Sequence, residues 1–157
     1  MSQGLKGFLK TAAVAALPLI SGAALAQDTD TGIQSRFRLV SADPETHLAT
    51  INESGKDFVT DCTELEVQQS WIENSIIREA TVPLSNNENN RLALYLGLGQ
   101  LTYEQAQRNY PEQIDKDPGN QFKYAAQLGK ERDVFIKAQK EAGCFVPKGR
   151  TLTPKAP

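Results

Sequence analysis

The sequence has very few of the residues on which catalytic and metal sites are usually built. Its 157 residues include one histidine, His47, and two cysteines, Cys62 and Cys144. No P-loop, dinucleotide-binding fingerprint, G-x-S-x-G motif or H-E-x-x-H motif occurs in it. A zinc site or a histidine-dependent triad needs several such groups together, so we interpret His47 as an exposed polar residue of a strand. We therefore predict no catalytic constellation, no metal and no cofactor.

Positive charge is also scarce. The chain has 17 lysines and arginines against 19 aspartates and glutamates, which gives a formal net charge of −2. A mildly acidic chain is a poor candidate for binding nucleic acid, whose phosphates attract basic groups. Residues 91–109 loosely fit a helix-turn-helix, but Arg108 is the only basic residue of the second helix. We therefore expect an αα-hairpin there and no nucleic-acid partner.

Long apolar runs are absent except near the N-terminus. Residues 11–20 form a short apolar run behind Lys6 and Lys10, and residues 24–26 (Ala-Leu-Ala) have the small side chains of a signal-peptidase site. The run is shorter than a typical membrane span. We predict that residues 1–26 are a cleaved bacterial signal peptide, with an uncleaved anchor as the alternative. Cleavage would leave 15 basic and 19 acidic residues, a net charge of −4. The protein would be periplasmic or secreted, with no membrane span after cleavage.

Two cysteines in an exported chain predict one disulfide, Cys62–Cys144. Closing a loop of about eighty residues stabilises the folded state by roughly 4–5 kcal/mol in the chain-entropy model. The alternative is a pair of free, redox-active thiols. A C-x-x-C spacing would favour that alternative, and the sequence does not contain it.

Apolar and turn-forming residues predict an α+β fold in a single domain, residues 36–146. Residues 36–61 are expected to form a small antiparallel β-meander of about three strands, with turns at residues 43–46 and 53–56. About four helices should follow. Two polar segments flank this domain, a flexible leader and a disordered tail: residues 27–35 and 147–157.

Capping residues mark the ends of the two longest predicted helices. Thr63 and Glu66 resemble a capping box at the start of the first helix. Asp117 should cap the last helix, with Pro118 at its first position and Gly143 ending it in the left-handed conformation. Apolar spacing predicts the buried faces: Leu65, Ile72, Ile76 and Ala80 in the first helix, and Tyr124, Leu128, Phe135, Ala138 and Ala142 in the last.

The segments between these helices give weaker signals. Residues 80–84 are either a linker or a short fourth strand, because Pro83 interrupts them. Thr102 should open a helix with Gln105 at its third position, and this helix should stop near Asn109 because a proline follows at position 111. Residues 110–119 are expected to be a polar connection.

Function is predicted from compartment and from aromatic residues. Trp71 lies off the apolar stripe of its helix; a place in the core is favoured, with a partner-facing role as the alternative. Tyr103 and Tyr110 are the other candidates to face a partner. These features favour a non-enzymatic interaction or accessory module of the cell envelope, which binds an unknown envelope protein or surface. The alternative is a small exported hydrolase of cell-wall glycan that uses carboxylates, nominally Glu104 with Asp115 or Asp117.

Overall fold

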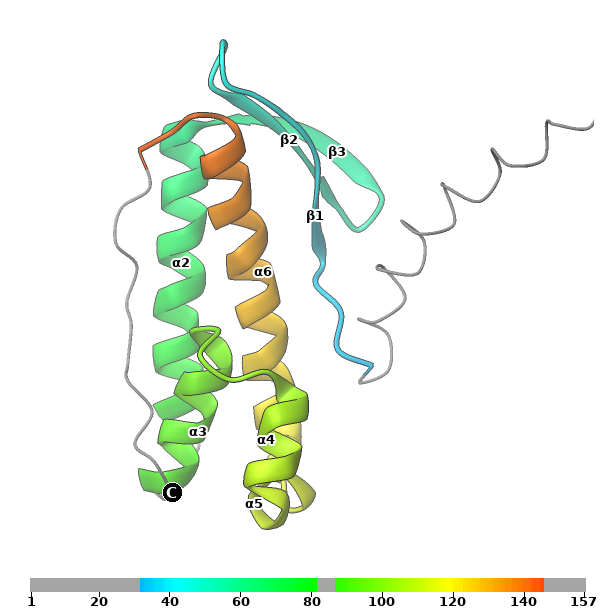
Figure 1. Cartoon of the computed structure of the whole chain (residues 1–157), viewed down its shortest axis with the longest axis vertical. Helices are drawn as coiled ribbons and strands as arrows, with labels where there is room; N and C mark the ends of the chain where they lie inside the picture. The colour runs from blue at the N-terminus through cyan, green and yellow to red at the C-terminus, as the bar shows by residue number, and fades with distance from the viewer. Residues whose placement is uncertain (1–31, 82–86, 146–157) are drawn as a thin grey trace, which may run out of the picture. The chain divides into compact units, whose positions relative to one another are not determined.

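The computed structural model describes residues 32–81 and 87–145. From Ile33 onward they form a three-stranded antiparallel sheet followed by five α-helices, shown in Figure 1. The elements are β1 (Phe37–Asp43), β2 (Leu48–Glu53), β3 (Lys56–Asp61), α2 (Cys62–Thr81), α3 (Asn87–Gly97), α4 (Tyr103–Asn109), α5 (Pro111–Asp115) and α6 (Gln121–Glu141). The predicted α+β class, the meander and the disulfide are confirmed.

Several predicted segments fall partly or wholly outside the described residues. The signal peptide (residues 1–26) and the tail (residues 147–157) lie outside them, as do positions 82–84 of the possible fourth strand. Residues 80 and 81 belong to α2, so a strand does not begin there. Ile33, within the predicted leader, is buried against α3 and α6 residues. Packing of the chain therefore includes Ile33, three residues before the expected domain start.

The sheet separates a buried face from an exposed one by simple alternation. Ala49 and Ile51 of β2 point into the core, and Leu48 is exposed. β2 pairs with β3 in an uninterrupted register, whereas the register of β1 against β2 shifts between Leu39 and Ser41. Such a bulge bends and twists a strand locally. The inner face of the sheet packs against one end of the helices, and the outer-face residues Val40, Leu48 and Val59 are exposed.

Two long helices, α2 and α6, lie side by side and provide a large part of the core (Figure 1). Their apolar residues form one cluster with the inner face of the sheet; among them are Leu65, Ile72, Ile76, Leu128, Phe135 and Ala138. Where the structure describes burial, these faces are the predicted ones with one exception; the burial of Ala80 lies outside the described features. Tyr124 is exposed at 38% of its surface, because its position on α6 falls at the edge of the buried arc.

α3 crosses its neighbours at two glycines that allow unusually close backbone approach. A Cβ placed on Gly129 of α6 would lie 2.5 Å from the carbonyl oxygen of Leu96. A Cβ on Gly97 would collide with the side chain of Ile76 in α2. Glycine is needed at both positions because a methyl group does not fit, and this packing places α3 against both long helices.

The capping predictions hold for α4 and need correction for α2. Thr102 and Gln105 form the expected capping box at the start of α4, with hydrogen bonds of 3.1 and 2.9 Å. α2 begins two residues earlier than a Thr63 cap requires, so its cap is Asp61, whose Oδ1 accepts a 2.9 Å hydrogen bond from the Glu64 amide. The predicted role of Thr63 is therefore wrong, because Thr63 already lies inside the helix.

The segment before α6 is more structured than predicted. Residues 110–119 were expected to be a plain connection, but they contain α5 and the start of a short 3-10 helix, Pro118–Asn120. The predicted start of α6 needs correction, because Asn120 holds the N-cap position and Pro118 lies in the 3-10 helix instead of at the first position of α6. The Asp117 carboxylate still accepts hydrogen bonds of 2.8 and 3.3 Å from the amides of Phe122 and Lys123 in the first turn of α6.

Candidate functional site

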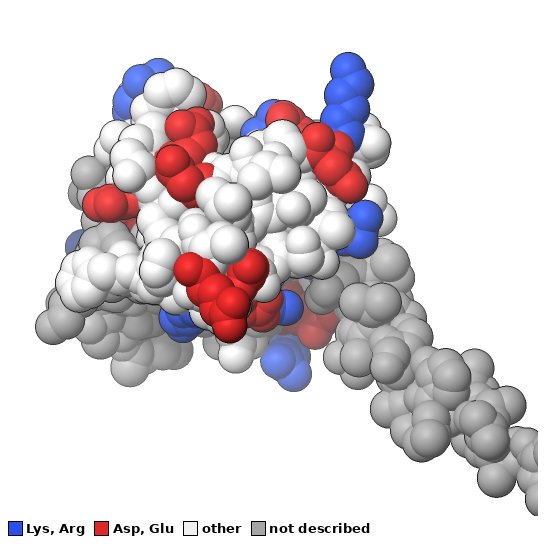
Figure 2. Space-filling model, turned by 90° about the horizontal axis from the view of Figure 1, so that it is seen from above, with Lys and Arg blue, Asp and Glu red and all other residues white. Residues whose placement is uncertain are grey.

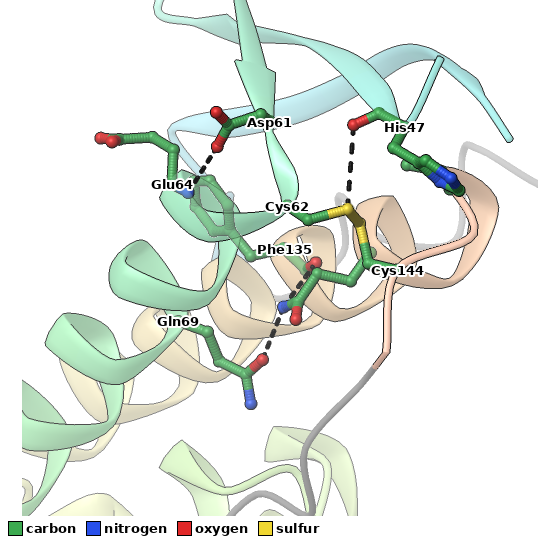
Figure 3. Close-up of a disulfide and its surroundings, with 9 residues drawn as sticks. His47, Asp61, Cys62, Glu64, Gln69, Phe135 and Cys144 are labelled. Carbon is green, nitrogen blue, oxygen red and sulfur yellow. Dashed lines mark hydrogen bonds between the residues drawn. A yellow bond between two sulfur atoms is a disulfide. The ribbon is translucent and has the colours of Figure 1, made fainter. Parts of the chain in front are cut away.

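The Cys62–Cys144 disulfide joins the start of α2 to the residue just beyond α6 (Figure 3). The two Cα atoms are 5.6 Å apart. Gly143 has a φ of 71°, and the Cys144 amide donates a 2.9 Å hydrogen bond back to the Gln139 carbonyl. This is a Schellman motif, the predicted glycine stop of the helix. The helix end itself thus brings the Cys144 sulfur to Cys62.

His47 covers this junction and is not placed as a catalytic base. It is exposed, as predicted, but it belongs to the turn before β2 and has a φ of 58°. Its Nδ1 lies 2.9 Å from the carbonyl oxygen of Ala142, so Nδ1 carries the hydrogen in this contact. Figure 3 shows His47 beside the disulfide, with its own carbonyl oxygen 3.8 Å from the Cys62 sulfur. The imidazole therefore satisfies a carbonyl at the end of α6.

A buried polar network links α2 to α6 and was not predicted. Glu73 accepts 2.9 Å hydrogen bonds from both Gln69 and Arg132. Gln139 donates a 2.6 Å bond to Gln69. The side chains of Arg132 and Glu73 are only 8% and 9% exposed. Because solvent hardly reaches this pair, it fixes how the two helices align and offers no entrance for a substrate.

A second ion pair fastens the chain ahead of β1 to α6. Glu131, whose side chain is fully buried, accepts hydrogen bonds of 2.8 and 3.0 Å from the Arg36 guanidinium and one of 3.3 Å from the Arg36 amide. The hydrogen bond to Glu131 raises the pKa of Arg36. Lys130 adds a 3.0 Å bond to the carbonyl oxygen of Ile33. The sheet is therefore held to α6 at this end as well as at the disulfide.

The outer face of the sheet exposes apolar side chains within an acidic surround. Its apolar members are Val40, Leu48 and Val59, of which Val59 is 66% exposed. Residues 37–61 contain two basic residues and five acidic ones, all five exposed: Asp43, Glu45, Glu53, Asp57 and Asp61. By register Asp43, Asp57 and Asp61 share the outer face with the apolar residues, as does the basic Arg38, whereas Glu53 lies on the inner side and Glu45 in a turn. We call this outer face, with the acidic residues on and around it, the acid-rimmed sheet face. Figure 2 views the sheet end of the molecule and shows uncharged surface with both carboxylates and Lys or Arg side chains around it.

The three residues predicted to face a partner occupy different environments. Trp71 is 65% exposed on α2, so its favoured place in the core was wrong; Val67, one turn earlier, is exposed beside it in the helix sequence. Tyr103 is buried, with only 8% of its surface exposed, and Tyr110 packs partly buried against the same cluster. The ring of Tyr103 packs in the core cluster beside Ala106 and leaves little surface for contact with a partner. Of the three candidates, Trp71 is the one whose aromatic ring is mostly exposed to solvent.

Of the three carboxylates named in the hydrolase hypothesis, one is already engaged in hydrogen bonds. Asp117 uses both oxygens to accept hydrogen bonds from the first turn of α6. Asp115 and Glu104 are exposed on two different short helices. Burial, with smaller contributions from Asp117 and Asp115, raises the pKa of Tyr103.

Among residues 32–81 and 87–145, no group of three or more histidines, cysteines or acids could hold a metal ion. No helix in this part of the chain has the length and apolarity to cross a membrane.

Comparisons of the chain with family models, with curated proteins and with solved structures found no match. Function is therefore inferred from the chain's own surface and chemistry.

Proposed function

We propose that this protein is an exported, non-enzymatic interaction module of the bacterial cell envelope, periplasmic or secreted, that binds its partner through the acid-rimmed sheet face. The observation that carries this proposal is the exposure of Val40, Leu48 and Val59 together on one open face of the sheet. Grouped exposed apolar side chains with a polar rim are typical of protein-binding surfaces.

Covalent, ionic and aromatic contacts hold the sheet in a fixed position against the helices. The disulfide holds the end of β3 through the adjacent Cys62, and the Arg36–Glu131 ion pair holds the chain at the start of β1. Phe37 packs edge-on against Phe135 of α6, with ring centroids 4.9 Å apart. A surface that is already rigid loses little conformational entropy on binding, so its apolar contacts translate more fully into affinity.

Export is supported by two independent features of the chain. The first 26 residues have the charge and apolar pattern of a signal peptide. Both cysteines are paired with each other. Disulfides persist in oxidising compartments, such as the periplasm and the exterior, and are rare in the cytosol.

The charge of the sheet face indicates the chemistry of the partner. Five exposed carboxylates against two basic residues favour a partner that brings lysine or arginine side chains around an apolar contact. Such complementarity accelerates association and excludes acidic competitors. The partner is thus expected to be a basic protein segment rather than nucleic acid.

Site-specific photocrosslinking in the producing cell tests this function. A photoreactive residue replacing Val59 should give one dominant crosslinked product, and one replacing Val40 should give the same product. Lys137 of α6 is a matched control, because its side chain is also 66% exposed. The proposal fails if neither sheet position gives a product, or if Lys137 gives the same product with equal yield.

A further inference from the structure

The backbone of β3 is available for pairing along one side. The strand order is β1-β2-β3, β1 packs against α6, and in the described part of the chain β3 pairs with β2 alone. A two-residue turn, Ser54 and Gly55, joins β2 to β3, and both residues have positive φ. In such a hairpin the closing pair, Glu53 and Lys56, is hydrogen-bonded, and bonded and non-bonded pairs alternate from there. Residues 57, 59 and 61 therefore point their backbone groups away from β2, towards the open edge.

The side chains of the same three residues form one outward row. Asp57, Val59 and Asp61 are exposed, and they alternate with Phe58 and Thr60, which are partly buried and buried. Because Asp61 caps α2, its carbonyl oxygen is taken up by the first turn of that helix. The edge thus offers the amide and carbonyl groups of Asp57 and Val59 and the amide of Asp61. An added strand that bonds to these groups also brings its side chains beside an acid–apolar–acid row.

We infer that β3 accepts an antiparallel strand of the partner, with an apolar residue opposite Val59 and lysine or arginine opposite Asp57 and Asp61. The inference rests on the proposed function and gives the mode of binding at the acid-rimmed sheet face. Opposite charges on directly facing residues stabilise a pair of strands. In strand addition the main-chain hydrogen bonds supply affinity, and alternate side chains supply specificity.

A second copy of the chain is a poorer occupant of this edge. In a symmetric antiparallel pair of β3 strands centred on Val59, Asp57 of each copy would lie opposite Asp61 of the other. Like charges in facing positions destabilise such a pair, and charged side chains on an edge keep identical edges apart. The acidic row therefore rejects its own copy and favours a cationic strand.

The added strand is short, because the turn at residues 54–55 bounds one end of β3 and α2 bounds the other. Its residues opposite Phe58 and Thr60 face the helices, where the neighbouring side chains are already partly or fully buried. Threonine is small and favoured in strands, so it suits these two positions. The peptide Lys-Thr-Val-Thr-Lys, acetylated and amidated at its ends, is the matching probe.

Titration of the full exported chain with this peptide, followed by amide NMR, tests the inference. At peptide concentrations up to about 5 mM, which reveal weak binding, the amides of Asp57, Val59 and Asp61 should shift more than those of Phe58 and Thr60. Unshifted β3 amides would overturn the inference. Shifts that follow protein concentration without any peptide would also overturn it, because the edges would then pair between copies.

A proline peptide separates strand pairing from charge attraction. Lys-Thr-Pro-Thr-Lys keeps both charges but lacks the central amide hydrogen that Val59 would accept, so it should bind at least about fivefold more weakly. Equal affinity of the valine and proline peptides means that charge alone attracts them, and strand addition is then refuted.

The variant Asp57→Lys tests the direction of the added strand. In the antiparallel register the C-terminal peptide residue lies opposite position 57. The variant should therefore bind Lys-Thr-Val-Thr-Glu about threefold or more tighter than Glu-Thr-Val-Thr-Lys. Glu45→Lys is the matched control, because Glu45 is an exposed acid of a turn outside β3; it should show no such preference. The opposite preference in Asp57→Lys would contradict the antiparallel register.

Photocrosslinking through position 59 separates this inference from the proposed function. A crosslinked partner in the cell, without discrimination between the valine and proline peptides, would refute strand addition alone. Discrimination between the peptides without any crosslinked partner would refute the proposed function alone.

Discussion

At the residue scale, the buried pair Glu73–Arg132 is the interaction whose loss should cost most. Both side chains are nearly inaccessible, and Gln69 is the only other side chain in hydrogen-bond contact with Glu73 among the described residues. Removing one partner leaves a buried charge without compensation. Arg132→Met should therefore destabilise the protein by about 3–5 kcal/mol.

The double variant Glu73→Leu/Arg132→Met is the control for this prediction. With both charges gone, an apolar pair of similar size should restore most of the lost stability. Urea unfolding of the parent and the three variants gives the coupling energy directly. If the double variant loses as much as the two single variants together, the pair is not coupled as the structure indicates.

Asp133 gives a prediction about pH. Partial burial raises the pKa of its carboxyl, with Arg132 and Lys140 opposing the shift; the carboxylate lies beside the turn at Gly99, while the residue as a whole is exposed, so we expect a small effect. A raised pKa in the folded state means that stability from this group is present below the unfolded value, near pH 4, and is lost as pH rises through the folded value.

Asp133→Asn should consequently raise the melting temperature at pH 7 and leave it nearly unchanged at pH 3. Thermal unfolding at the two pH values measures the difference. Glu141→Gln is a suitable control, because Glu141 is exposed on the same helix and the substitution removes the same charge. An equal effect of Asp133→Asn at both pH values would contradict the assigned cause.

At the element scale, the start of α2 tests whether Asp61, rather than Thr63, caps this helix. Asp61→Ala should destabilise the protein by about 1 kcal/mol, because it removes the acceptor for the Glu64 amide at the start of α2. Thr63→Ala should change stability by no more than about 0.5 kcal/mol, because Thr63 is an exposed residue inside the helix. Denaturant midpoints distinguish the two. The reverse order would restore Thr63 as the cap.

Elements defined by local chemistry could be predicted from the sequence. The turns of the meander, the capping box at Thr102 and the glycine stop at Gly143 each depend on residues within a few positions, and all three are observed. Their geometry is set by hydrogen bonds between near neighbours. Short sequence patterns are therefore sufficient to predict these turns and helix ends.

Contacts across the fold could not be predicted in the same way. Gln69 and Glu73 are polar, so an apolar stripe assigns them to solvent, yet each finds its partner on α6, about 60–70 residues later. The exposure of Trp71 was missed for the converse reason, since a lone large aromatic is more often buried. The acid-rimmed sheet face became visible only when strand register showed which side chains share a side.

At the scale of the whole molecule, the disulfide is the main stabilising crosslink. It joins residues separated by 82 positions. The variant Cys62→Ser/Cys144→Ser should lose roughly 4–5 kcal/mol, equivalent to many degrees in melting temperature. Calorimetry under non-reducing conditions measures this loss. Alkylation followed by intact mass should find no free thiol in exported protein, and a detectable thiol would contradict the pairing of the two cysteines.

β3 and α2 meet without a single connecting residue, since the strand ends at Asp61 and the helix begins at Cys62. The corner between them is also the point to which Cys144 is bonded. Because no loop lies between β3 and α2, a change in direction at the end of β3 acts directly on the first turn of the 20-residue α2, and the disulfide couples the same point to the end of α6.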